Sequence, residues 1–257
     1  MSTQLNTSLN TQGNLSGKVA LVTGGSRGIG AAIAQRLAHD GATVAITYAS
    51  SPQRAEEVVA AIKAAGGKAL AIQADSGNAA AVRSAVSHTV EAFGGIDILV
   101  NNAGALAAAP IDDFRFDDYE RLIAVNVTAV FVAAQEAARH MKSGGRIINI
   151  GSVNSDYVPV AGLSVYALTK GAVASFTRGL ARDLGARGIT VNNVQPGPVD
   201  TEMNPAAGPF ADTMRSYLAT GKYGTGAQVA GMVAYLASSE AAYVTGANLK
   251  VDGGFDA

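Results

Sequence analysis

Residues 23–30 read TGGSRGIG, and they stand between the apolar run Val19–Val22 and a stretch near 28–39 with a helical pattern. Glycines let the backbone turn tightly and approach a pyrophosphate, and the start of a helix offers free N–H groups with partial positive charge. The stretch therefore predicts a strand–turn–helix unit that binds a dinucleotide through its phosphates. The loop residues expected to contact the dinucleotide are Gly24, Ser26, Arg27, Gly28, Ile29 and Gly30.

Short apolar runs alternate with amphipathic stretches along the rest of the chain. Most runs are continuous, as expected for strands buried on both faces of a parallel sheet. The expected strands are Val19–Val22, Val44–Thr47, Ala69–Ile72, Ile98–Val100, Ile147–Ile150, Val191–Val194 and Leu249–Val251, and the expected helices lie near 28–39, 52–65, 78–93, 117–141, 166–185 and 227–237. This alternation predicts an α/β Rossmann fold, a doubly wound parallel sheet of about seven strands with helices on both faces.

The chain shows no internal linker, charge block or repeat, so we expect one domain over residues 15–257. Residues 1–14 have no charged side chain and no apolar block, which predicts a disordered tail. A secretory signal would need a basic start and an apolar centre. The lack of these features, together with the lack of cysteine, favours a cytoplasmic location.

Composition excludes several classes of protein. The 257 residues include no cysteine, so a disulfide scaffold, thiolate catalysis and cysteine-ligated metal are ruled out. The net charge of −1 gives no electrostatic footprint for nucleic acid or an anionic membrane. No apolar run approaches the roughly 18 residues that span a bilayer. The three histidines lie on separate expected helices without ligand spacing, so we expect no catalytic metal.

Tyr166 and Lys170 lie four residues apart within Val165–Gly185, which is predicted to be a helix. Four residues make about one turn, so both side chains share a face. An ammonium near a phenol favours the phenolate, and we therefore expect Lys170 to lower the pKa of Tyr166. Such a tyrosine can donate a proton to a nascent alkoxide, or accept one in the reverse direction. The alternative is a surface pair without a role.

Two more polar residues stand where a hydrogen-bonding role is expected. Ser152 follows the strand Ile147–Ile150 and so lies at the carboxyl end of a strand, where ligands bind in open α/β sheets. Its hydroxyl can bond a substrate carbonyl. Asn126 stands between two valines in the helix near 117–141, where an amide is costly unless it is hydrogen-bonded. It is either a buried amide that bonds only backbone or part of a functional network.

The loop at 23–30 resembles the cofactor loop of the short-chain dehydrogenase/reductase family. Further motifs of the family follow in order, over residues 15–257: Asn101-Asn102-Ala103-Gly104, Ser152 with Tyr166-Ala167-Leu168-Thr169-Lys170, Pro196-Gly197, Val244-Thr245-Gly246 and Asp252-Gly253-Gly254. The resemblance implies that Ser152 polarises a carbonyl and that Tyr166 is the acid/base. It also implies that Lys170 tunes Tyr166 and holds the nicotinamide ribose, and that Asn126 holds a water in a proton relay. The serine and tyrosine are 14 residues apart here, whereas family members usually place them 13 apart.

The stretch Tyr48-Ala49-Ser50-Ser51 bears on the choice of cofactor. An NAD site normally places a carboxylate here to bond the ribose 2′-hydroxyl, but no Asp or Glu lies between Asp40 and Glu56. Arg27 can supply positive charge to a 2′-phosphate, unless it is a solvated loop charge. The sequence therefore favours NADP(H) over NAD(H). The other expected cofactor-binding residues, most of them by resemblance, are Tyr48, Ser50, Asp75, Ser76, Asn102, Ala103, Gly104, Tyr166, Lys170, Pro196, Gly197, Val199 and Thr201.

Residues 198–225 form the least regular stretch, and we expect them to form a flexible lid over an apolar pocket for a ketone or aldehyde. The candidate pocket walls are Leu106, Val153, Asn154, Tyr157 and Met203, while Val199 and Leu163 fit either pocket or core. The resemblance also implies that the helices near 117–141 and 166–185 form a dimer face, within a homotetramer of twofold symmetry.

Two functions remain open from the sequence. The first is an NADPH-dependent carbonyl reductase, reversible as an alcohol dehydrogenase, in which Tyr166 supplies the proton as hydride leaves the nicotinamide. The chain is similar in this respect to the family's 3-oxoacyl-carrier-protein reductases. The second is a regulatory nucleotide-binding protein, because residues 194–205 resemble those of cyclic-di-GMP-binding biofilm-dispersal mediators. The complete set of Ser152, Tyr166 and Lys170 favours the enzyme.

Overall fold

The computed structural model describes residues 14–257, so the tail predicted at 1–14 lies outside the described residues except for Asn14. Its centre is one sheet of seven parallel strands in the order β3-β2-β1-β4-β5-β6-β7. The strands are β1 (Val19–Val22), β2 (Thr43–Tyr48), β3 (Lys68–Gln73), β4 (Ile98–Asn101), β5 (Arg146–Ile150), β6 (Thr190–Pro196) and β7 (Asn248–Val251). The predicted doubly wound fold is confirmed.

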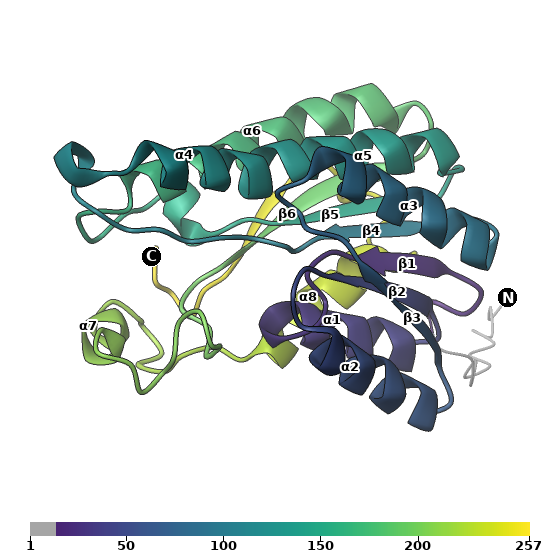
Figure 1. The fold of residues 1–257 in the computed structure, drawn as a ribbon, viewed down its shortest axis with the longest axis horizontal. Coiled ribbons are helices and arrows are strands. Elements are labelled where there is room, and N and C mark those ends of the chain that lie inside the picture. Colours follow the sequence, from purple (N-terminus) through teal and green to yellow (C-terminus); the bar gives the residue numbers. More distant parts are fainter. Residues whose placement is uncertain (1–13) are drawn as a thin grey trace, which may run out of the picture.

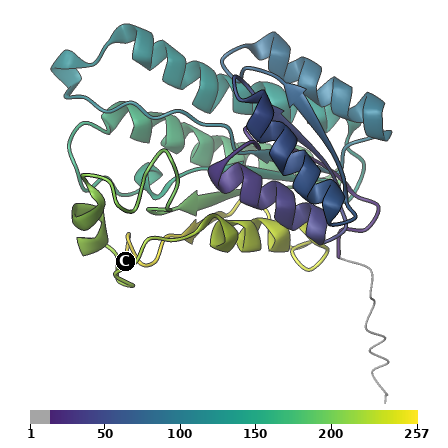
Figure 2. The same ribbon diagram turned by 60° about the horizontal axis from the view of Figure 1, so that its bottom comes forward.

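Helices cover both faces of this sheet. They are α1 (Gly28–His39), α2 (Pro52–Ala64), α3 (Ala79–Phe93), α4 (Phe116–Ile123), α5 (Ala129–His140), α6 (Ser164–Gly185), α7 (Ala211–Ser216) and α8 (Gly226–Ala237). Figures 1 and 2 show α1, α2 and α8 on one face and α3 to α6 on the other. The strand β1 supplies both layers, because Ala20 and Val22 join the core under α1 and α8 while Leu21 joins the core under α3, α5 and α6.

The sheet order places a crevice beside β1. The chain proceeds from β1 outward to β2 and β3, and then returns to the opposite side of β1 as β4. The loops that follow β1 and β4 therefore leave the sheet in opposite directions at its carboxyl edge. This is the position at which open α/β sheets bind their ligands.

The helix expected near 117–141 is interrupted. Between α4 and α5 the backbone forms a wider π-helical turn, Ala124–Thr128, with Asn126 buried in it. Taken together, Phe116–His140 is long and apolar enough to span a membrane, contrary to our expectation that no segment approached that length. In the fold, 61% of the most apolar 18-residue stretch of this segment is buried, so contacts within the protein cover most of its apolar surface.

Residues 198–225 contain more regular structure than the sequence indicates. They include the short helix α7, which lies near the C-terminus in Figures 1 and 2. Leu218 from this stretch packs with Val153 and with Phe255 from the chain end. Val153 is therefore a core residue, and our assignment of it to the pocket wall is wrong. Val199 likewise belongs to the main core, whereas Leu106, Tyr157 and Met203 are exposed.

Candidate active site

Four loops meet at the carboxyl edge of the sheet and position the expected site. The phosphate loop follows β1, the segment Asn102–Gly104 follows β4, Ser152 follows β5, and Gly197 follows β6. Because all the strands are parallel, these loops lie along one edge. The structure thus places motifs that are more than 170 residues apart in sequence on one side of the sheet.

Ser152, Tyr166 and Lys170 come together as the sequence predicts. Ser152 is buried, begins the short turn Val153–Ser155, and its side chain is hydrogen-bonded to that of Tyr166. Tyr166 stands in the first turn of α6 and Lys170 one turn later. The Lys170 Nζ atom lies 5.7 Å from the centre of the Tyr166 ring. The helix thus brings a phenol and an ammonium to the hydroxyl that ends β5.

The pKa of Tyr166 differs from our expectation. Burial raises the pKa of the phenol above its ordinary value, and the hydrogen bond with Ser152 offsets this only in part. The Lys170 ammonium donates to the Ile150 carbonyl oxygen at 2.9 Å, and burial lowers the pKa of Lys170 from 10.5 to about 8. The prediction that the pKa of Tyr166 lies below its ordinary value is therefore wrong, because desolvation dominates at this site.

The serine is held through a chain of hydrogen bonds that the sequence did not reveal. The Ser155 hydroxyl donates to the Ser152 carbonyl oxygen at 2.8 Å and accepts from the side-chain amide of Gln195. Gln195 is fully buried in β6. The Ser152 hydroxyl in turn accepts from the backbone N–H of Asn154 at 3.1 Å. These contacts fix the start of the loop that contains the extra residue between serine and tyrosine.

Asn126 is fully engaged with protein groups. Its side-chain oxygen accepts from the Ala105 N–H at 2.8 Å, and its amide donates to the Ala105 carbonyl and to the Thr169 hydroxyl. A side chain added at Gly104 would lie 3.6 Å from the Asn126 oxygen and 3.7 Å from Lys170 Nζ. Asn126 therefore ties the segment after β4 to α6 beside the lysine. Its role in a water relay stays a prediction.

The phosphate loop is built for close backbone approach. A Cβ at Gly30 would lie 2.3 Å from the Gly24 carbonyl oxygen, so no other residue fits there. Gly24 and Gly28 have φ of +63° and +54°, a conformation that favours glycine. The Asn102 side chain donates to the carbonyls of Thr23 and Gly24 at 2.9 and 3.1 Å. These contacts fit a backbone cradle for a pyrophosphate at the start of α1.

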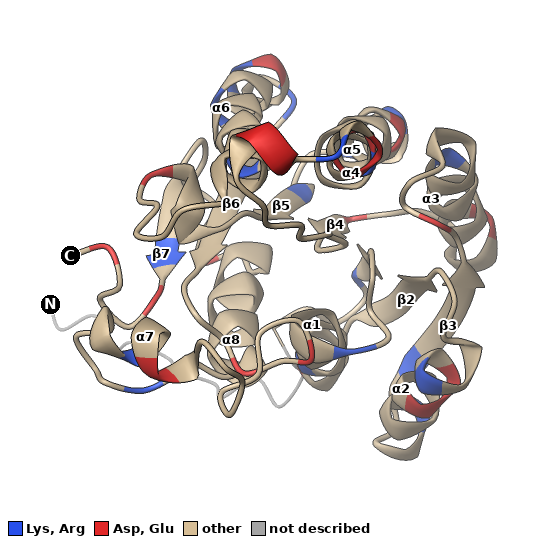
Figure 3. Ribbon diagram, turned by 60° about the vertical axis from the view of Figure 1, so that its left-hand side comes forward, with Lys and Arg blue, Asp and Glu red and all other residues tan. Residues whose placement is uncertain are grey.

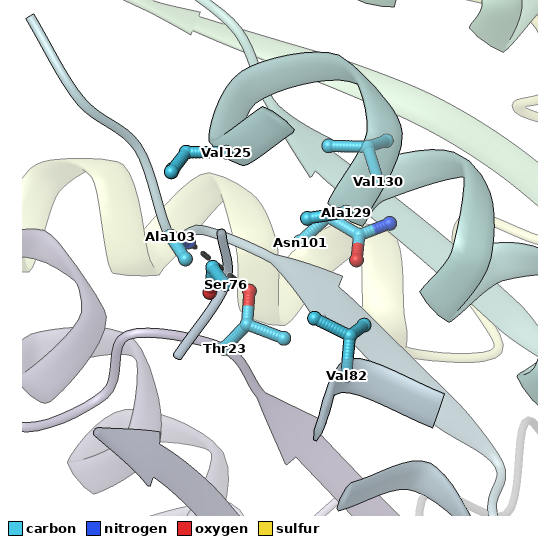
Figure 4. Close-up of a pocket in the computed structure, with 8 residues that line it drawn as sticks. All are labelled: Thr23, Ser76, Val82, Asn101, Ala103, Val125, Ala129 and Val130. Carbon is cyan, nitrogen blue, oxygen red and sulfur yellow. Dashed lines mark hydrogen bonds between the residues drawn. The ribbon is translucent and has the colours of Figure 1, made fainter. Parts of the chain in front are cut away.

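A small cavity lies beside this cradle rather than beside Ser152 and Tyr166. Its lining residues, labelled in Figure 4, are Thr23, Ser76, Val82, Asn101, Ala103, Val125, Ala129 and Val130. The Ala103 N–H donates to the Thr23 hydroxyl at 3.0 Å, which joins the loops after β1 and β4. Ser76 and Ala103, two predicted cofactor contacts, thus lie at one place. Asp75, next in the chain, is exposed and bonds the Gly77 N–H at 2.8 Å.

The loop after β6 crosses the phosphate loop. Pro196 ends β6, and a Cβ at Gly197 would lie 2.7 Å from Asp252, which explains the glycine at position 197. Thr201 lies over Gly28, since a Cβ at Gly28 would be 3.4 Å from the Thr201 methyl group. The predicted nicotinamide-side residues therefore lie next to the predicted phosphate-side residues.

The end of β2 holds a basic residue that our sequence analysis missed. Tyr48 ends the strand half-buried and Ser50 is exposed. Arg27 reaches this region, and so does Arg54 from the first turn of α2; both guanidiniums bond the same carboxylate, Glu202. The sequence signal that could have pointed to Arg54 is a basic residue soon after β2, in a stretch where no Asp or Glu lies between Asp40 and Glu56. Together the two arginines form a site for an anion.

No group of three or more histidine, acidic or cysteine side chains within residues 14–257 is arranged to hold a metal ion. Acidic and basic residues are interspersed over the helices (Figure 3). The one strongly buried acidic side chain on α5, Glu136, is paired with Arg139 at 2.9 Å and lies 3.7 Å from Arg83.

The chain belongs to the short-chain dehydrogenase/reductase family of oxidoreductases. A family model described as enoyl-(acyl carrier protein) reductase matches residues 24–256. Among curated proteins, the chain is 48% identical to the cyclic-di-GMP-binding biofilm dispersal mediator protein of Escherichia coli K12, over 95% of this chain and 100% of that one. The resemblance predicted from the motifs is confirmed.

Solved structures agree with this assignment. A short-chain dehydrogenase/reductase from Serratia marcescens is 59% identical with a TM-score of 0.94, and it covers 95% of this chain and 100% of its own. A short-chain dehydrogenase from Burkholderia cenocepacia, solved in complex with NADP, is 56% identical with a TM-score of 0.94 and the same coverage. The fold is thus shared with a protein solved in complex with NADP.

Proposed function

We propose that the protein is an NADPH-dependent carbonyl reductase that also runs in reverse as an alcohol dehydrogenase. The observation that supports this most is the junction of Ser152, Tyr166 and Lys170 on the sheet edge that also holds the phosphate cradle. When bound there, the nicotinamide supplies or accepts the hydride. Substrates with little charge fit the exposed apolar side chains of Leu106, Tyr157 and Met203 near the loops.

The three side chains divide the work of the reaction. The Ser152 hydroxyl orients and polarises the carbonyl oxygen. The Tyr166 phenol, whose pKa lies above its ordinary value, holds the proton that the alkoxide takes up. Lys170 is mainly protonated at neutral pH, since its pKa is about 8, and its ammonium favours the developing phenolate.

The preference for NADPH rests on charge at the end of β2. No carboxylate stands there to bond a 2′-hydroxyl, and Arg27 and Arg54 supply two guanidiniums for a 2′-phosphate. The Burkholderia cenocepacia relative in complex with NADP supports the same choice.

The test is oxidation of NADPH by the purified protein against a panel of prochiral ketones and aldehydes, with Tyr166→Phe as the matched variant. We expect turnover with at least one apolar ketone, and its loss in Tyr166→Phe without loss of NADPH binding. Turnover that persists in Tyr166→Phe would reject the assigned acid/base.

A second function has one specific observation in its favour, the 48% identity to a protein named for cyclic-di-GMP binding. The same phosphate cradle and arginine pair could hold this anionic dinucleotide. Titration with cyclic-di-GMP beside the turnover assay separates the two. Tight binding without turnover of any carbonyl would favour the regulator over the enzyme.

We also propose that α5 and α6 form a dimer face within a tetramer. A groove between these helices is lined by Phe131, Phe176, Leu180 and Leu184, and Phe131 is 47% exposed. Its ring meets that of Phe176 edge to face at 6.1 Å. An exposed phenylalanine that packs on a partly buried one in a groove is typical of an interaction surface. We propose separately that the protein is cytoplasmic. The lack of cysteine supports this location, and cell fractionation tests it.

A further inference from the structure

Glu202 is bonded by both arginines at the end of β2. Its Oε2 atom lies 3.2 Å from Nη1 of Arg27, and its Oε1 atom accepts from Nη1 of Arg54. Each oxygen of the carboxylate thus takes one guanidinium. Within residues 14–257, neither arginine has another carboxylate within ion-pair distance.

The carboxylate comes from a distant part of the chain and is held in place by a turn. Residues 201–204 form a tight turn, in which the Asn204 N–H donates to the Thr201 carbonyl at 3.1 Å. Thr201 packs over Gly28 of the phosphate loop. The loop after β6 therefore delivers Glu202 across the phosphate loop to arginines that lie 175 and 148 residues earlier.

A carboxylate and a phosphate monoester compete for the same partners. Both present oxygens to guanidinium N–H groups, and arginine pairs bind either. Glu202 therefore occupies the position that a 2′-phosphate must take if Arg27 and Arg54 are to bind it. A ribose 2′-hydroxyl has no charge with which to displace it.

We infer that Glu202 is a specificity-determining residue, an internal anion that the 2′-phosphate of NADPH displaces from Arg27 and Arg54. The inference rests on the proposed cofactor. Entry of the phosphate exchanges one anion for another, so the two arginines are never left unpaired. The exchange lowers the affinity for phosphorylated dinucleotides below what the arginines alone would give. It leaves the affinity for unphosphorylated ones unchanged.

The test uses 2′,5′-ADP and 5′-AMP, which differ only in the 2′-phosphate and lack the nicotinamide. Binding of both is measured by calorimetry for the full chain, for Glu202→Gln and for Glu57→Gln. Glu57 is an exposed acid on α2, one turn from Arg54, so it controls for the general loss of a negative charge.

We expect Glu202→Gln to tighten 2′,5′-ADP binding by about three- to tenfold, as suits half-exposed ion pairs, and to leave 5′-AMP binding unchanged. Glu57→Gln should alter the binding of both ligands by less than twofold, roughly the effect of one surface charge screened by solvent and salt. Unchanged or weaker binding of 2′,5′-ADP to Glu202→Gln would overturn the inference, and so would equal tightening of 5′-AMP.

Failure of the inference can be told from failure of the proposed cofactor. If the wild-type protein prefers 2′,5′-ADP and Glu202→Gln does not change it, the cofactor stands and only the role of Glu202 falls. If the wild-type protein binds both nucleotides equally and Arg54→Ala changes neither, both proposals fall. Circular dichroism of each variant confirms that the fold is kept.

Discussion

Burial of Lys170 sets the chemistry of the site at the scale of single residues. Its side chain is 5% exposed and its ammonium bonds the carbonyl at the end of β5. Burying a charge costs free energy, which is why the pKa falls to about 8. In the proposed reaction, the same charge favours a phenolate on Tyr166. The site therefore places a destabilising group where the proposed reaction uses it.

Replacement of Lys170 by methionine should reveal this cost as a pH dependence of stability. Between about pH 8 and pH 10.5 the unfolded chain binds a proton at Lys170 that the folded protein has lost, so the contribution of Lys170 to wild-type stability rises with pH over this range. A shift of this size is worth about 3 kcal/mol. The free energy of unfolding of Lys170→Met, measured relative to that of the wild type, should therefore be higher at pH 7 than at pH 10.

Urea unfolding of both proteins at several pH values measures this difference. Titrating groups remote from Lys170 are common to both proteins, so their contributions cancel in the comparison. A stability difference that stays constant from pH 7 to pH 10 would contradict the assigned pKa.

Arg27 and Arg54 should decide between the two nicotinamide cofactors. Arg27→Ala removes one charged hydrogen-bond donor to a 2′-phosphate, so we expect NADPH affinity to fall by roughly tenfold or more. NADH affinity should change by much less. Kd values from the fluorescence of each bound cofactor measure this, with Arg178→Ala on α6 as a control. Equal loss with both cofactors would reject the assignment.

The three side chains that the structure brings together could be predicted from the sequence, but their environment could not. The spacing of Tyr166 and Lys170 and the strand-end position of Ser152 follow from periodicity, which a sequence shows directly. The direction of the pKa shift of Tyr166 depends on burial by distant segments, which periodicity does not show. Arg54 was missed for a similar reason, since its role depends on a loop that joins it 148 residues later.

At the scale of elements, the π-helical turn between α4 and α5 is tied to the polar contacts of Asn126. Three hydrogen bonds to Ala105 and Thr169 engage its amide. The sequence predicted one continuous helix near 117–141, because the apolar pattern continues through the turn. The interruption coincides with a tertiary contact between Asn126 and the segment after β4, which a local sequence pattern does not show.

All seven strands were predicted within two residues of each end, since buried strands have a strong local signal.

Asn126→Ala should therefore destabilise the protein and disturb the segment after β4. It leaves the Ala105 N–H without its partner, and a buried unpaired donor costs about 2 kcal/mol. Thermal and urea unfolding measure the loss. Gln35→Ala, an exposed amide on α1, is the control and should change stability little. Unfolding of Asn126→Ala that matches the wild type would show that these bonds contribute nothing.

At the scale of the whole molecule, the order of the strands creates the site. Alternation of strands and helices predicted a doubly wound sheet, but it could not give the order β3-β2-β1-β4-β5-β6-β7. That order arises because the chain adds β2 and β3 on one side of β1 and then continues with β4 on the other side. The four loops of the site lie along one edge of this sheet. The position of Glu202 across the phosphate loop is a consequence of this arrangement.

The groove on α5 and α6 should mediate assembly. Phe131→Glu places a charge in an apolar contact, which is costly without a partner, so we expect the assembly to dissociate. Light scattering coupled to size-exclusion chromatography measures the molar mass. Phe210→Glu, at a phenylalanine that is 72% exposed near α7, should leave the mass unchanged. A wild-type protein that is already monomeric at micromolar concentration would contradict the proposed face.

The most direct test of the proposed reaction follows the hydride itself. The protein is supplied with NADPH deuterated at the transferable position of the nicotinamide and with a ketone that it turns over, and the alcohol is analysed by mass spectrometry. We predict one deuterium on the carbinol carbon with the wild-type protein and no labelled alcohol with Tyr166→Phe. Alcohol without deuterium, or labelled alcohol in equal yield from Tyr166→Phe, would contradict the assignment of this site as a tyrosine-dependent reductase.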